Sequence, residues 1–163
     1  MNLTVEGRRD TARPSSEDIH RAIAGMALPL GPTFIILAAG EGSYIQAAGS
    51  NGRFVFESRD VYGEGFRHWR AFQPGAADGG PAVVTYRQRC PRGKHPSRGC
   101  PIAVRQSDVM SHASVMSAIL QFAQDGSRSA KLEWRDISID FLPASDADCR
   151  IRDISPRSRR PEP

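Results

Sequence analysis

The sequence lacks an apolar run long enough to cross a membrane. Its longest uninterrupted apolar stretch, Phe34 to Ala39, is six residues long, whereas a spanning helix needs about 20. The first residues, Met1 to Glu6, also lack the basic start and apolar segment of a secretory signal. We therefore expect a cytoplasmic protein without a membrane partner.

Familiar catalytic motifs are absent as well. None of the patterns G-x-S-x-G, H-E-x-x-H and G-x-x-x-x-G-K-[ST] occurs in the 163 residues. Acyl transfer, zinc-dependent proteolysis and P-loop chemistry therefore lose their main sequence support. We expect no catalytic residues and no cofactor. One enzymatic alternative stays open, a small hydrolase in which His68 is the general base and Glu57, on an adjacent strand, is its carboxylate partner.

Cysteine is scarce, with three residues in the chain. Cys90, His95 and Cys100 are each separated by four residues, as in the second half of a zinc knuckle, but the position of the fourth ligand is occupied by Arg87. The alternatives are a zinc site, a disulfide between the two cysteines, and a loop with free thiols. Three local ligands do not complete a tetrahedral site and the cytosol is reducing, so we expect the free-thiol loop and no metal.

Positive charge is concentrated in one segment. The net charge is +4, yet residues 87–105 contain six Lys and Arg and no acid. The tail 143–163 contains five Arg and four acids, which leaves eleven bases and fourteen acids elsewhere. We expect one mildly acidic domain over residues 1–142, with a basic loop at 87–105, followed by a disordered polyampholytic tail.

The basic loop contains candidate phosphate contacts. Its cations are Arg89, Arg92, Lys94 and Arg98, and such side chains bind nucleic-acid backbones with an affinity that falls as salt rises. The loop has no aromatic residue after Tyr86 on which a base could stack. A nucleic-acid-associated accessory protein is therefore an alternative function and not the main hypothesis.

Two segments have helical periodicity. Ser15 can cap a helix over residues 16–27, in which four apolar residues recur at helical spacing. Ser107 can cap a second helix that ends at Asp125 and Gly126. The apolar stripe expected on this second helix consists of Val109, Ala113, Met116, Leu120 and Ala123, and it is widened by Ile119 and Phe122.

Alternating segments separated by glycine-rich turns predict an antiparallel meander. The turns are expected at residues 40–43, at residues 49–52, which contain an Asn-Gly pair, and at residues 63–65. The expected strands cover residues 33–39, 44–48, 53–59, 66–72 and 83–86. Within residues 131–142 the apolar side chains switch from even-numbered to odd-numbered positions. If these residues form one strand, the switch requires a bulge near Arg135 and Asp136. The predicted class is α+β, an antiparallel sheet of about five or six strands with two helices packed on it.

Strand alternation also predicts a partner-binding surface. Along residues 66–72, Phe66, His68, Arg70 and Phe72 point to one face, whereas Arg67 and Trp69 point to the other. If Phe54 and Phe56 share the buried face with Phe66 and Phe72, the opposite face presents the predicted partner-binding residues. These are Glu57, Arg67 and Trp69.

Five short segments together resemble a known class of protein. They are Thr33–Leu37, Ser43–Gly49, Phe54–Arg59, His68–Ala71 and Leu132–Trp134. Their order is similar to that in small bacterial immunity proteins of polymorphic toxin systems. The resemblance implies a cytoplasmic protein that binds and neutralises one cognate toxin without a cofactor; the basic segment and the Arg-rich tail are not part of that pattern. The main hypothesis is therefore a protein-binding module.

Overall fold

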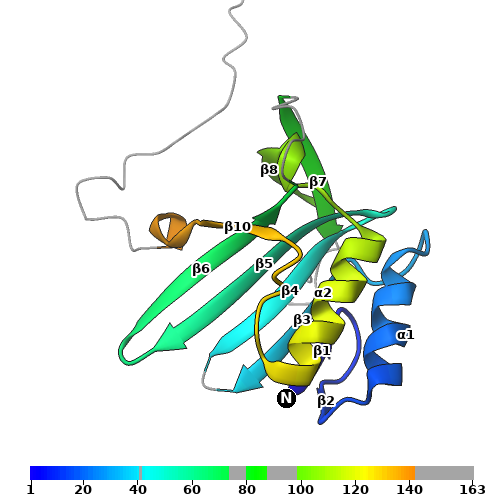
Figure 1. Ribbon diagram of the computed structural model, residues 1–163. Coiled ribbons are helices and arrows are strands. Elements are labelled where there is room, and N and C mark those ends of the chain that lie inside the picture. The colour runs from blue at the N-terminus through cyan, green and yellow to red at the C-terminus, as the bar shows by residue number, and fades with distance from the viewer. Residues whose placement is uncertain (41, 74–79, 88–98, 142–163) are drawn as a thin grey trace, which may run out of the picture.

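The fold is built around one large antiparallel sheet (Figure 1). The structure is a computed structural model that describes residues 1–40, 42–73, 80–87 and 99–141. Within these ranges the sheet has eight strands, in the order β10-β6-β5-β4-β3-β1-β2, with β9 paired to β5. The strands are β1 (Asn2–Val5), β2 (Thr11–Ala12), β3 (Phe34–Gly40), β4 (Ser43–Ser50), β5 (Arg53–Tyr62), β6 (Gly65–Phe72), β9 (Met110–Ser111) and β10 (Glu133–Asp136). The predicted α+β class is confirmed, with more strands than expected.

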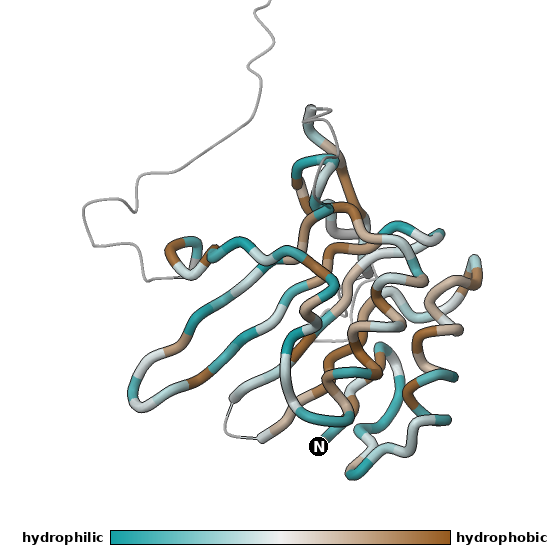
Figure 2. The backbone as a smooth tube through the Cα atoms, in the orientation of Figure 1, coloured by the Kyte–Doolittle hydropathy of each residue, from teal (hydrophilic) through white to brown (hydrophobic). Residues whose placement is uncertain are grey.

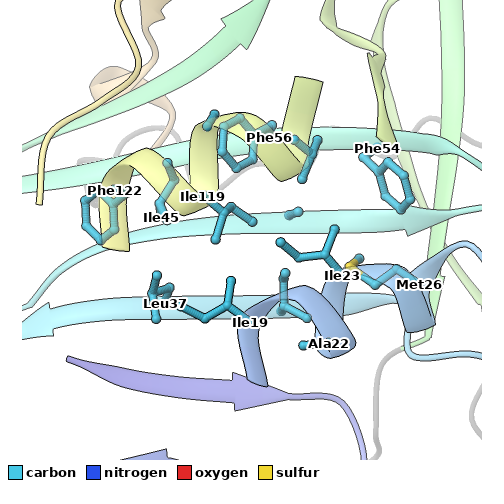
Figure 3. Packing of buried hydrophobic residues seen from close by; sticks show 14 of the residues in the cluster. Ile19, Ala22, Ile23, Met26, Leu37, Ile45, Phe54, Phe56, Ile119 and Phe122 are labelled. Atoms are coloured by element: carbon cyan, nitrogen blue, oxygen red, sulfur yellow. The ribbon is translucent and has the colours of Figure 1, made fainter. Parts of the chain in front are cut away.

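Two helices cover one face of this sheet (Figure 1). They are α1 (Ser16–Met26) and α2 (His112–Asp125), and hydrophobic stretches of the chain lie where they meet the strands (Figure 2). The opposite face, which α1 and α2 leave uncovered, is called the outer face below. Figure 3 shows side chains of both helices packed against residues from the strands; the labelled residues include Ile19, Ile23, Leu37, Ile45, Phe56, Ile119 and Phe122.

Local sequence explains α1 and the central hairpins. The Ser15 side chain accepts a hydrogen bond from the backbone of Asp18, whose carboxylate accepts one from the backbone of Ser15, a complete capping box. Between β4 and β5, Asn51 and Gly52 have φ angles of 54° and 74°, the positive values that a type I′ two-residue hairpin requires. Both elements form where the sequence predicts them.

The second helix begins later than predicted. Ser107 belongs to a 3₁₀ turn, η1 (Gln106–Asp108), and the N-cap of α2 is Ser111. The residues of α2 that are buried are Val115, Ala118, Ile119 and Phe122. Of the stripe predicted from the sequence, Met116, Leu120 and Ala123 are only partly buried, Ala113 is exposed and Val109 precedes the helix. The face of α2 that bears the bulky Ile119 and Phe122 packs on the sheet, because this orientation buries more apolar area than packing the face of Ala113 and Leu120 would.

The C-terminal strand is shorter than predicted and needs no bulge. β10 ends at Asp136, and residues Ser138–Phe141 form a second 3₁₀ turn, η2. The change of apolar phase in the sequence therefore marks the end of a strand. Beyond it, the amide of Ile137 donates a 2.8 Å hydrogen bond to the carbonyl of His68, which holds the chain beside β6.

A separate two-stranded arm packs against the outer face. It consists of β7 (Pro81–Arg87) and β8 (Gly99–Arg105). The sequence places β7 correctly as a strand but assigns residues 99–105 to a basic loop, whereas they form β8. Ala82, Val84 and Val104 of the arm are buried in a second apolar cluster with Val55 and Val109. This cluster attaches the arm to β5.

Replacing Ile119 by alanine tests which face of α2 is buried. Ile119 is fully buried in the main core, so Ile119→Ala should lower the free energy of unfolding by about 3 kcal/mol. Leu120→Ala is the matched comparison, because Leu120 is only partly buried at the margin of the same core. Urea denaturation of both variants measures the difference; a larger loss for Leu120→Ala would contradict the observed helix orientation.

Candidate functional site: a polar row on the outer face

A row of polar side chains crosses the outer face of the sheet. Strand register places Gln46 opposite Glu57, Glu57 opposite Arg70, and Arg70 opposite Arg135. Because directly opposite residues in antiparallel strands project to the same face, all four side chains lie in one line across β4, β5, β6 and β10. We call these four residues the polar row.

Glu57 is the hub of the polar row. Its side chain is buried, at 7% exposure. Gln46 Nε2 donates to Glu57 Oε2 at 2.7 Å, and Arg70 donates through Nε and Nη2 to Oε1 at 2.9 and 2.7 Å. His68 Nε2 lies 3.3 Å from Oε2. The carboxylate therefore has charged or polar partners on both of its oxygens, which is what a buried charge requires.

These partners also set the protonation of Glu57. Burial raises the pKa of its carboxyl, but the hydrogen bonds from His68, Arg70 and Gln46 and the charge of Arg70 outweigh burial, so the pKa lies below its ordinary value. Glu57 is ionised at neutral pH as a consequence.

His68 is held tightly beside Glu57. Its side chain is 2% exposed and meets the ring of Tyr44 edge-on at 6.0 Å between centroids. Its backbone amide donates to Ser138 Oγ at 2.9 Å. The predicted neighbourhood of His68 and Glu57 is therefore present. The contact belongs to a buried network that fixes the orientation of both side chains.

Asp108 extends the charge network to the base of the arm. It lies in η1, directly after β8, and is 1% exposed. Arg135 Nη2 donates to Asp108 Oδ1 at 2.6 Å, and Arg70 Nη1 lies 4.0 Å from Asp108 Oδ2. Arg70 thus lies between two buried carboxylates, and Asp108 ties the end of β8 to β6 and β10. Sequence analysis missed Asp108 because it was assigned to the start of a helix.

The predicted partner-binding residues do not share one face. Glu57 is buried on the outer face, whereas Arg67 and Trp69 project to the helix side. Phe66 and Phe72 likewise project to the outer face, opposite to Phe54 and Phe56. The sequence interpretation took residues 63–65 as the turn, but Tyr62 pairs with Gly65, so the loop has two residues. A shift of one residue in register reverses every side chain of a strand.

Arg67 and Trp69 belong instead to a cluster near the end of the β5–β6 hairpin. The guanidinium of Arg128 stacks 4.0 Å from the centroid of the Trp69 ring and pairs with Asp60 at 3.3 Å. Arg67 lies 5.9 Å from the Trp69 ring and 5.7 Å from the Tyr62 ring. We call these five residues the tip cluster. Arg128 was not predicted, because it joins from the loop after α2.

The remaining predicted site residues fall outside the described ranges. Arg89, Arg92, Lys94 and Arg98, as well as Cys90 and His95, lie in residues 88–98, and the side chain of Cys100 in β8 is likewise outside the described part of the structure. Among the described residues, no group of three or more His, Cys, Asp or Glu is arranged to hold a metal ion. The same residues include no helix with the length and apolar character needed to cross a membrane.

Comparison with protein-family models, with curated proteins and with solved structures gives no match. Support for a function therefore comes from the site geometry and from the resemblance of the five sequence segments.

The network predicts a pH-dependent contribution of Glu57 to stability. Glu57→Gln removes the negative charge that accepts two hydrogen bonds from Arg70, and should cost about 3 kcal/mol at neutral pH. A lowered folded-state pKa gives stability that is present above the ordinary value of 4.5 and lost as pH falls through the folded-state pKa. The gap between wild type and Glu57→Gln should therefore shrink in acid, as measured by urea denaturation.

Glu133→Gln is the matched control for this experiment. Glu133 is an exposed carboxylate on β10, so its variant should behave as wild type at every pH. A gap between wild type and Glu57→Gln that stays constant down to low pH would contradict the role given to the ionised carboxylate.

Proposed function

We propose that this protein works by binding another protein and that, in its sharpest form, it is an immunity protein that neutralises a cognate bacterial toxin in the cytoplasm. The observation that carries the proposal is the tip cluster. Four of its five residues, one Trp, one Tyr and two Arg, are of the types that dominate binding energy in protein interfaces. The more specific immunity role is supported by this geometry together with the sequence resemblance to immunity proteins.

The position of the tip cluster suits contact with a large partner. The β5–β6 hairpin extends past the end of α2, so its far end stands clear of the helix layer (Figure 1). Tyr62 is 52% exposed at this end, and Arg67 is exposed beside it. A projecting hairpin can enter a concave site on a partner, which is one way to block a toxin sterically.

The stacking within the cluster prepares it for binding. Arg128 is fixed by both the ring of Trp69 and the carboxylate of Asp60, so little side-chain freedom remains to be lost on association. Stacked arginines also keep their outer edges available for hydrogen bonds to a partner. The cluster therefore offers a rigid aromatic centre with two cations, a surface complementary to an apolar patch bordered by acids.

A double variant tests this function. Tyr62→Ser combined with Arg67→Glu removes an exposed ring and reverses a charge without touching the core. It should weaken binding to the toxin encoded by the neighbouring gene by more than about 2 kcal/mol in calorimetry. Protection of cells that co-express that toxin should be lost in parallel.

Leu30→Ser is the matched control. Leu30 is 88% exposed in the loop after α1, so this variant should bind and protect as wild type does. Equal affinity of the folded double variant would eliminate the tip cluster as the interface. Absence of binding and protection by the wild-type protein would eliminate the immunity function itself.

A further inference from the structure

A groove runs between the arm and the outer face of the sheet. Its larger hollow has a volume of about 500 Å³, within the range of small-ligand and peptide-anchor sites. The apolar part of its lining comes from the sheet and from the arm. These residues are Phe34, Ile36, Ala48, Val55, Tyr86 and Ile102.

The polar row forms part of the floor of this groove. Gln46, Glu57 and Arg70 line the same hollow. Arg70 also lines a second hollow of about 370 Å³, which lies toward β10. Arg70 thus borders both hollows, and we call the two hollows together the arm groove.

The second hollow has an excess of positive charge. Three arginines, Arg70, Arg105 and Arg135, line it together with Asp108 and Asp140. Asp108 is engaged by Arg135 and approached by Arg70. Arg105 is exposed and makes no ion pair within the described part of the chain. The arm groove is thus apolar at the end near β3 and cationic at the end near β10.

We propose that the arm groove binds an extended peptide segment of another protein, with an apolar side chain in the larger hollow and an acidic side chain against Arg105. The positive charge of Arg105 favours the acidic residue. The walls formed by Ile36, Ala48 and Ile102 favour the apolar residue. This proposal is independent of the tip cluster, because Arg67 and Trp69 lie on the opposite face of the sheet.

The dimensions of the sheet set the spacing within such a peptide. The apolar end lies over β3 and β4 and the cationic end over β6 and β10. Neighbouring strands are about 4.8 Å apart, so these ends are separated by roughly 14 Å. An extended chain advances about 3.3 Å per residue. The acidic residue should therefore lie about four positions from the apolar residue.

The floor between the two ends favours a peptide over a lipid-like molecule. Gln46 and Arg70, which hold the buried Glu57, present further polar groups of their amide and guanidinium there. An alkyl chain laid across them would desolvate these groups without hydrogen bonds, which is costly. A peptide backbone carries a donor and an acceptor in every residue other than proline, and so can satisfy them.

The test is selection of a random heptapeptide display library on the full-length protein. Wild type should enrich sequences with an apolar residue and an Asp or Glu about four positions apart. Arg105→Glu reverses the charge of one exposed side chain, so the same selection should enrich Lys or Arg at that position. Ala48→Leu fills the larger hollow and should weaken a selected peptide at least tenfold in fluorescence polarisation.

Two controls make the outcome decisive. Arg53→Glu changes an exposed arginine of β5 that does not line either hollow, and Tyr62→Ser alters only the tip cluster; both should select as wild type does. Circular dichroism confirms the fold of each variant. No enrichment on wild type, or an enrichment that Arg105→Glu and Ala48→Leu leave unchanged, would overturn the proposal. Binding of dodecanoate without peptide enrichment would also overturn it, in favour of an amphipathic carboxylate.

Discussion

The register between β5 and β6 is the constraint on which the rest of the structure depends. It places Glu57 opposite Arg70 on the outer face, and it places Phe54 and Phe56 on the helix side, where they enter the core. Because side chains alternate strictly along a strand, these two outcomes cannot be separated. The hydrophobic core therefore holds the charged pair in position, and the pair in turn disfavours a slipped register that would bury Glu57 or Arg70 under α2.

Charge balance between buried carboxylates and arginines then determines how the outer face and the arm are held together. Glu57 and Asp108 are buried carboxylates, and Arg70 and Arg135 are their principal partners. Removing one member would leave a buried charge uncompensated, which costs more than the intact pair contributes. Since Asp108 follows β8 directly, the same network fixes the arm above the sheet. The arm groove exists because an ion network and the apolar cluster around Val55 hold its two walls together.

Local signals in the sequence were sufficient to predict α1, the Asn51–Gly52 turn and the shared face of His68 and Arg70. They failed where an element depends on distant contacts. The loop before β6 has two residues and not three, and this difference of one residue places Glu57 and Trp69 on opposite faces of the sheet. β8 was missed because its strand character comes from pairing with β7 and not from its own basic, proline-containing sequence. Arg128 joined Trp69 from another element, which no local pattern reveals.

The two faces of the β5–β6 pair consequently carry different chemistry. Toward the hairpin end, the helix side presents stacked aromatic and cationic groups that depend on a loop after α2. The outer face presents a floor of paired charges that depends on register alone. A surface variant in the tip cluster can change binding without disturbing Glu57, whereas a change at Glu57 alters the stability of the whole sheet before it alters any surface. Residues that hold the fold and residues that we propose to contact a partner are therefore separable here, although they alternate along the same two strands.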